Sequence, residues 1–295
     1  MFQCPTAPLR ECWSCKSQPP EYYSRALEPV SATTLILAWC WCQLALTTLK
    51  RNNSITTQQP SPAGGPRLRF SIDQQPDLTT CGPTCLQAVY RYFGDNEDLG
   101  TIISEVKSIA TGGTLAVMLG CHALKRGYDA RIYTFNLQVF DPTWFSSSTV
   151  DISDRLTRQM HVKDDLKLRG ACAAYIEFLA LGGTIRMTDL NAALIRKYLT
   201  RSVPILAGLS STYLYQESRE MGPECRPDDL QGVPTGHFVV LSGYDPIERT
   251  VAVADPHLMN PSKQHHYEVP LDRAICSILL GIVTYDANLL IIRPV

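Results

Sequence analysis

The sequence predicts an α+β fold, in which helices from the first part of residues 66–295 pack against an antiparallel sheet from the second part. Residues 81–93 repeat apolar side chains at helical spacing, whereas residues 238–244 form a continuous apolar and β-branched run. Asp245-Pro246 then marks a turn, and residues 250–254 alternate as the returning strand of a hairpin. Helices and antiparallel strands that occupy different parts of a chain are typical of α+β proteins.

The helices are predicted from apolar spacing together with residues that begin or end helices. The first begins at or just after Cys81, because Pro83 suits a first helical position and Gly94 can end the helix. The later helical segments are predicted at residues 99–109, at residues 115–124 with a stop near Gly127, at residues 151–181, at residues 190–199 and at residues 269–282.

The strands are predicted from short apolar runs that turn residues separate. Most of them fall after residue 200, where the sequence changes from helical to extended patterns. The predicted strands are residues 129–135, 204–209, 238–244, 250–254 and 287–292.

Residues 1–65 differ in composition from the rest and are expected to form an extension outside the folded domain. Residues 51–66 are rich in Pro, Gly, Ser, Thr and Gln, as linkers are. Residues 33–49 carry no charged side chain and are close to the minimum length of a membrane span. We therefore expect a cytoplasmic protein, or alternatively one that residues 33–49 anchor to a membrane.

The charge balance gives no sign of a nucleic-acid partner. The chain has 27 basic and 28 acidic residues, with a formal net charge of -1 at pH 7. A polyanion-binding surface usually needs a basic excess. The number of cysteines, eleven, is odd, and the chain is far too long to be a small disulfide scaffold. The pair Cys12 and Cys15 lacks the second pair that a zinc site would need. No metal or cofactor is predicted.

Cys81 is the strongest candidate for a nucleophile. A cysteine at a helix N-terminus lies beside unpaired backbone N–H groups and the positive end of the helix dipole, which favour the thiolate. Gly82 would leave room beside the sulfur. Gln75 could present its amide where the oxyanion of a tetrahedral intermediate forms.

His237 and Asp255 are the candidates for the base and its orienting partner. A thiolate nucleophile in acyl transfer needs both. His237 is predicted near the start of one strand of the hairpin, and Asp255 at the end of the other. Since these two ends are neighbours in an antiparallel pair, we expect the side chains to lie within hydrogen-bond reach.

Three motifs, Q-x5-C-G-P-T-C-L, G-H-F-V-V-L-x-G-Y and A-D-P, together resemble those of a known family. The chain is similar over residues 70–294 to the papain-like cysteine peptidases that process double-glycine leader peptides of bacteriocins, and to their stand-alone relatives. The resemblance implies the papain-like fold. It also implies that Cys81 is the nucleophile, His237 the general base, Asp255 the orienting carboxylate and Gln75 the oxyanion-hole side chain.

Three features differ from the bacteriocin-processing members. The sequence has no Walker-type G-x4-G-K-[ST] motif or multi-span region, so we expect a stand-alone relative. Thr80 stands where an acidic residue often precedes the cysteine, and the insertion at residues 140–182 is longer than expected. The substrate is therefore expected to be a peptide or protein of unassigned sequence.

Other residues could compete for these roles. Gln74 is an alternative to Gln75, which only the family spacing favours, and Asp245 is an alternative to Asp255 that lies at the far end of the hairpin. Cys85 is expected in the core, and His257 is expected to line the cleft. The loop at residues 217–232 could be a lid or a surface connection. The glycine pairs at residues 64–65 and 182–183 are interpreted as turn and helix-end residues rather than cleavage sites.

Three functions are compatible with these residues. The first is a cysteine peptidase that works through a thioester acyl-enzyme, and the second is a thiol-dependent acyl transferase in which an amine captures the same intermediate. The third is a leader-peptide-binding module without turnover. The four competent side chains favour an enzyme over a binding module.

Overall fold

The computed structural model describes residues 65–108, 113–222 and 224–295. The predictions for residues 1–64, the linker and the anchor segment among them, lie outside the described residues. No described helix is long and apolar enough to cross a membrane.

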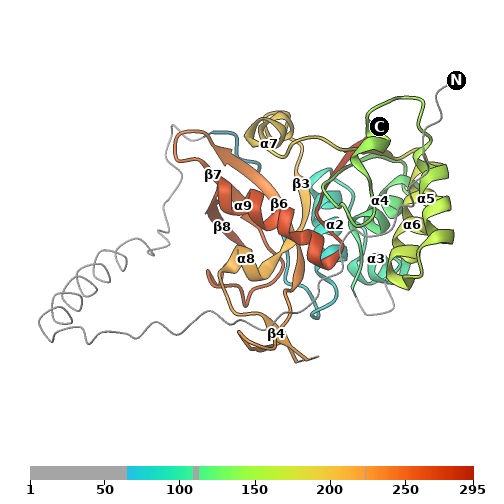
Figure 1. Cartoon of the computed structure of the whole chain (residues 1–295). Helices are drawn as coiled ribbons and strands as arrows, with labels where there is room; N and C mark the ends of the chain where they lie inside the picture. The colour runs from blue at the N-terminus through green and yellow to red at the C-terminus, as the bar shows by residue number, and fades with distance from the viewer. Residues whose placement is uncertain (1–64, 109–112, 223) are drawn as a thin grey trace, which may run out of the picture. The chain divides into compact units, whose positions relative to one another are not determined.

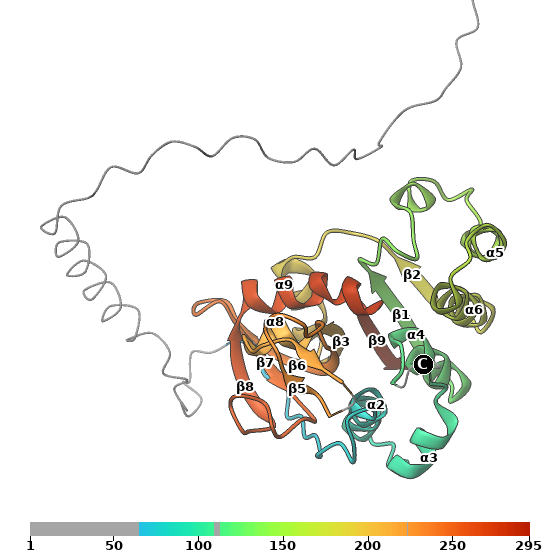
Figure 2. The same cartoon turned by 60° about the horizontal axis from the view of Figure 1, so that its bottom comes forward.

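The described residues form a seven-stranded sheet with helices on both faces (Figures 1 and 2). The sheet order is β2-β1-β9-β3-β6-β7-β8, and every neighbouring pair is antiparallel except β1 and β2. A separate two-stranded sheet joins β4 to β5. The strands are β1 Tyr128–Thr134, β2 Thr184–Arg186, β3 Ile205–Ser210, β4 Glu220–Met221, β5 Arg226–Pro227, β6 Gly236–Asp245, β7 Thr250–Ala254, β8 His266–Pro270 and β9 Asn288–Pro294.

The helices divide between two hydrophobic cores because successive strand residues point to opposite faces of the sheet. In β6, Phe238 and Val240 belong to one core, whereas Val239 and Leu241 belong to the other. Figures 1 and 2 show α2 to α6 together at one side of the domain, and α8 and α9 against β3 and β6. The helices are α2 Cys81–Tyr92, α3 Leu99–Glu105, α4 Ala116–Lys125, α5 Ile152–Val162, α6 Leu166–Ala180, α7 Ala192–Leu199, α8 Ser211–Tyr215 and α9 Leu271–Leu280, with short 3₁₀ helices at Pro142–Phe145 and Gly281–Thr284.

The α+β prediction is confirmed, and most predicted elements are found within a few residues of their expected limits. Residues 151–181 form two helices, α5 and α6, rather than one continuous run. The prediction of a helix from residue 269 was wrong at its start: the chain continues as β8 to Pro270 and only then turns into α9. Alternation in β8 and its pairing with β7 explain the difference, because Val251 lies opposite Val269.

The two glycine pairs have structural explanations in their described members. A Cβ on Gly65 would lie 2.1 Å from the carbonyl oxygen of Tyr244, so the chain can approach β6 there only with glycine. Gly182 has φ +91° directly after Leu181, the C-cap residue of α6, as the interpretation as a helix end requires.

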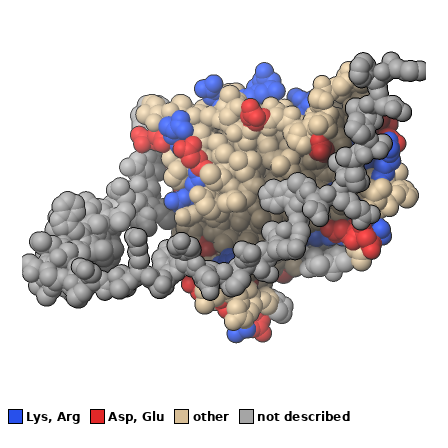
Figure 3. All heavy atoms as spheres, in the orientation of Figure 1, with Lys and Arg blue, Asp and Glu red and all other residues tan. Residues whose placement is uncertain are grey.

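Charged residues on the face seen in Figure 3 are of both signs. Lys and Arg lie close to Asp and Glu around the edge of this face, while uncharged atoms occupy its middle. This mixed distribution agrees with the near-zero net charge of the sequence.

Candidate active site

Cys81 is the first residue of α2, and its thiol is free and partly exposed. The residue before the helix, Thr80, makes no side-chain cap; its hydroxyl bonds the carbonyl oxygen of Asp77 instead. The start of α2 therefore has no hydroxyl or carboxylate cap to compete with the sulfur for the positive end of the helix. Pro83 falls in the first turn, where a missing N–H is tolerated.

His237 is the second residue of β6, and its side chain is 8% exposed. Its Nε2 lies 2.9 Å from Oδ1 of Asp255. Val240 pairs with Ala254 across β6 and β7, so His237 and Asp255 lie at the adjoining ends of the two strands and meet diagonally. Asp255 bonds Nε2 of the ring, and the sulfur of Cys81 lies close enough to act on the pKa of His237.

The electrostatics of the site favour an imidazolium at His237. Burial lowers the pKa of His237. The charges of Asp255 and Cys81 and their hydrogen bonding raise it by more than burial lowers it, so the pKa is raised to about 10. A group with this pKa stays protonated through neutral pH. It can stabilise a thiolate and later donate its proton.

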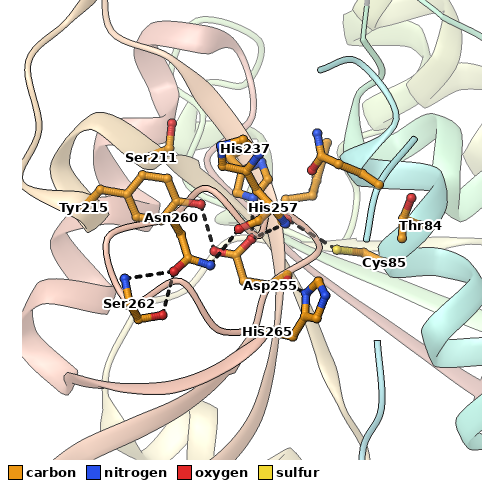
Figure 4. Close-up of polar contacts among 12 residues, drawn as sticks. Thr84, Cys85, Ser211, Tyr215, His237, Asp255, His257, Asn260, Ser262 and His265 are labelled. Atoms are coloured by element: carbon orange, nitrogen blue, oxygen red, sulfur yellow. Dashed lines mark hydrogen bonds and ion pairs between the residues drawn. The ribbon is translucent and has the colours of Figure 1, made fainter. Parts of the chain in front are cut away.

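Asp255 follows β7 directly and is fully buried. Four donors surround its carboxylate: His237 and the backbone N–H of His257 at Oδ1, and the hydroxyls of Tyr215 and Tyr267 at Oδ2. Figure 4 shows Asp255 between Tyr215 and the two histidines. Burial alone would raise the pKa of Asp255, but His237 and these hydrogen bonds lower it below its ordinary value. The carboxylate is therefore ionised and fixed in orientation.

Gln75 is 7% exposed and lies on the loop that leads to α2. Its backbone N–H donates to the carbonyl oxygen of Pro256, next to Asp255, over 3.0 Å. Its Nε2 donates to the carbonyl oxygen of Asp77 over 2.7 Å, which uses one of its two hydrogens, while Oε1 is buried without a partner among the described residues. Gln74, by contrast, is exposed.

Gly82 and Cys85 join α2 to the sheet. A Cβ on Gly82 would lie 2.5 Å from Cγ2 of Thr114 and 3.2 Å from Phe238 in β6. The glycine therefore permits close packing of α2 inside the domain. Cys85 is buried, as expected, and its Sγ donates to the carbonyl oxygen of Phe238 over 3.3 Å.

His257 lies on the loop after Asp255, with its ring centroid 6.0 Å from that of His237 and 6.5 Å from that of Tyr215. Burial, and next the charge of His237, lower the pKa of His257, so it favours the neutral form. The charge of Glu220 in β4 raises this pKa, so Glu220 lies within electrostatic range of His257.

Asp245, the alternative to Asp255, and two further histidines lie apart from this group or have other partners. Asp245 ends β6 at the hairpin turn and accepts from the N–H groups of Ile247 and Glu248. His122 bonds Tyr90 and Glu105 between α2, α3 and α4, and His161 is exposed on α5. Throughout residues 65–108, 113–222 and 224–295, no group of three or more His, Cys, Asp or Glu side chains could hold a metal ion.

Sequence reasoning missed Tyr215 and Tyr267. Tyr215 ends the five-residue helix α8, which no periodicity signals, and Tyr267 lies in β8, whose start was not predicted. The signal that could have found Tyr267 is its alternation with Val269 just before Pro270.

Comparison with known proteins identifies one family. The model of the Peptidase_C39 like family matches residues 174–275, which include His237 and Asp255 but not Cys81 or Gln75. Among proteins with curated descriptions, no sequence matches the chain.

Three solved structures are similar to the chain at low identity. The peptidase domain of Streptococcus ComA, a bifunctional ABC transporter of a quorum-sensing pathway, is 14% identical with a TM-score of 0.37, over 77% of this chain and 100% of that one. A double-glycine-motif protease from an AMS/PCAT transporter, solved with its leader peptide, is 13% identical with a TM-score of 0.38, over 81% and 100%. Xylellain, a cysteine protease from Xylella fastidiosa, is 13% identical with a TM-score of 0.39, over 81% and 91%.

Similarity at this level transfers no residue roles and no substrates. The match of residues 174–275 to the model of the Peptidase_C39 like family supports the predicted family resemblance.

Proposed function

We propose that the chain is a cysteine peptidase that hydrolyses a peptide bond through a thioester at Cys81. The observation that carries the proposal is the hydrogen bond between His237 Nε2 and the buried carboxylate of Asp255, in an imidazole whose pKa the sulfur of Cys81 also raises. An ordered base and a cysteine at a helix N-terminus are what covalent acyl transfer needs.

In the first half of the reaction, the thiolate of Cys81 attacks the carbonyl carbon of the scissile bond, and the electron pair of the C=O bond moves to its oxygen. The second hydrogen of Gln75 Nε2 is available to stabilise this oxyanion. The intermediate then collapses to a thioester as the C–N bond breaks. His237 donates its Nδ1 proton to the leaving amine.

In the second half, neutral His237 takes a proton from water at Nδ1, and the resulting hydroxide attacks the thioester carbonyl. Collapse of the second intermediate releases the carboxylic acid product and the thiolate of Cys81, while the proton stays on His237 to restore the ion pair. Asp255 keeps the ring oriented throughout and stabilises each imidazolium form without taking the proton itself.

Mass-spectrometric analysis of a peptide library incubated with the full chain tests the proposal. We expect cleavage by the wild type and by Cys276→Ala, which removes a partly exposed thiol from α9, and loss of at least about 10³-fold in rate for Cys81→Ala. Equal cleavage by the wild type and Cys81→Ala, or no cleavage by the wild type, would contradict a peptidase. Products found only as amides of an added amine would instead indicate an acyl transferase.

A further inference from the structure

Two tyrosine hydroxyls meet at the oxygen of Asp255 that does not contact His237. Tyr215 donates to Oδ2 over 2.8 Å from α8, and Tyr267 donates to the same atom over 2.6 Å from β8. Figure 4 shows Tyr215 pointing toward Asp255 from the side opposite α2. These hydroxyls have no role in the bond-making steps above, so their convergence on one buried oxygen needs a separate explanation.

The hydrogen bonds use the full acceptor capacity of the carboxylate. An ionised carboxylate offers about four lone-pair sites, and Asp255 has four donors, two at each oxygen. Rotation about the Cβ–Cγ bond would break all four bonds in a site without solvent exposure. The two tyrosines thus anchor Oδ2, and this leaves Oδ1 directed at Nε2 of His237.

Both hydroxyls are permanent donors. Burial, and next the charge of Asp255, raise the pKa of Tyr215 and of Tyr267 far above the ordinary value for tyrosine. Both phenols are therefore protonated at neutral pH. The carboxylate therefore has two O–H donors that do not depend on the state of His237.

We propose that Tyr215 and Tyr267 are positioning residues, which keep Asp255 ionised and its Oδ1 directed at His237 during catalysis. The inference rests on the proposed function, because it gives the tyrosines a part in preparing the pair of Cys81 and His237. Each hydroxyl acts through Asp255 and touches no reacting atom.

Other titratable groups also face Asp255 and contribute to any pH dependence. They come from α2, from β6 and from the loop that precedes β8. They are Cys81, Cys85, His237, His257 and His265, the last of which bonds the backbone carbonyl of Asp255 through Nδ1. Conservative changes at the tyrosines leave all of these groups in place.

Tyr215→Phe and Tyr267→Phe in the full chain isolate the hydroxyls. Phenylalanine keeps the ring of Tyr215 that stacks on His257 at 6.5 Å. The readout is the rate at which iodoacetamide alkylates Cys81, followed by peptide mapping from pH 4 to pH 9, which needs no substrate. Tyr90→Phe is the matched control, because it removes another buried hydroxyl, which bonds His122 over 2.8 Å.

The expected direction follows from the lowered pKa of Asp255. Loss of one donor raises that pKa, so the carboxylate is protonated at a higher pH and the imidazolium of His237 loses its counter-charge earlier on acidification. A hydrogen bond to a charged group corresponds to a shift of about one pH unit or more in the acid limb of the alkylation profile. The double variant should shift further, and Tyr90→Phe should not shift the limb.

A double-mutant cycle with Asp255→Asn separates positioning from a purely structural role. If the hydroxyl of Tyr215 acts through the carboxylate, its loss changes the alkylation rate by less than about twofold once the charge is gone. Two results would overturn the proposal. One is an acid limb of the alkylation profile that stays in place in both single tyrosine variants. The other is a fall in the alkylation rate that is the same whether residue 255 is Asp or Asn. If Tyr267→Phe does not fold, Tyr215→Phe alone decides.

The outcomes for the peptidase and for the tyrosines are distinguishable. A shifted acid limb without cleavage of any peptide would support the positioning role and contradict the proposed function. The converse result is that the protein cleaves peptides while the acid limb of its alkylation profile stays in place in both tyrosine variants. This result would support the proposed function and contradict the positioning role.

Discussion

At the scale of single residues, Asp255 is the most constrained side chain of the candidate site. It is buried among donors from β6, α8, β8 and its own loop, and all four hydrogen bonds are 2.9 Å or shorter. A buried charge of this kind is tolerated only when it is paired and fully hydrogen-bonded. This explains why the carboxylate remains an anion and why His237 carries its proton at neutral pH.

Part of this residue-scale arrangement could be predicted and part could not. His237 and Asp255 follow from hairpin geometry, because an antiparallel turn brings the two strand ends together whatever else the chain does. Tyr215 and Tyr267 depend on where α8 and β8 pack, and no local pattern in the sequence records that packing. From the sequence, only the family spacing favours Gln75 over Gln74. In the structure the two differ physically, because Gln75 is buried and bonds the carbonyl oxygen of Pro256 through its backbone N–H, whereas Gln74 is exposed.

The first prediction at this scale concerns Gln75. Its Nε2 keeps one hydrogen beyond the bond to Asp77, so Gln75→Ala should lower kcat by a factor of about 10² to 10³ with little change in KM. Steady-state kinetics on a cleaved peptide give the result. Gln74→Ala, next to it and exposed, is the matched control and should stay close to wild type. A Gln75→Ala enzyme within about twofold of wild type would remove this residue from the oxyanion site.

At the scale of elements, the site depends on how closely α2 lies against β6. Gly82 has no room for a side chain beside Thr114 and Phe238, and Cys85 bonds the carbonyl of Phe238, one residue after His237. The same contacts that bury α2 therefore fix the position of Cys81 relative to the imidazole of His237. The packing of α2 and the position of the candidate nucleophile are therefore linked at this junction.

The second prediction tests this link through Gly82→Ala. The added methyl group would lie 2.5 Å from Cγ2 of Thr114, so we expect a loss of about 1–3 kcal/mol in the free energy of unfolding, measured by urea denaturation. Thr114→Ser removes that Cγ2 atom and keeps the hydroxyl that bonds Lys107. The double variant should recover stability, and a double variant no more stable than Gly82→Ala would show that the clash is not the cause.

The elements that could not be predicted share a physical feature. β2, β4 and β5 are three residues long or shorter and α8 has five residues, which is too short for a periodic pattern to emerge. Long elements such as α2 and β6 carry several repeats of their pattern and were placed within a few residues. The start of β8 was missed because its alternation runs into the apolar face of α9, and the two patterns merge at Pro270.

At the scale of the whole molecule, the elements that contribute to the site all pack on one continuous sheet. β6 and β7 present His237 and Asp255, while α2 brings Cys81 against one face and α8 brings Tyr215 from the other. Residues 140–182 form mainly α5 and α6, and α6 packs against α4 and β2, away from this group. The sequence indicated a fold of helices on a sheet, but only the structure shows that helices cover both faces.

The proposed function requires Cys81, His237 and Asp255 to form one charge-coupled unit, and NMR of ¹⁵N-histidine-labelled protein can detect that coupling. The pKa of His237, about 10, predicts that the ring stays doubly protonated from pH 6.5 to pH 8 and loses its proton only as the pH rises toward 10. Because the sulfur of Cys81 contributes to that value, Cys81→Ala should move the titration to lower pH, and Cys276→Ala should not. A His237 ring that is already neutral at pH 8, with the same titration in Cys81→Ala, would show that the three residues are not coupled.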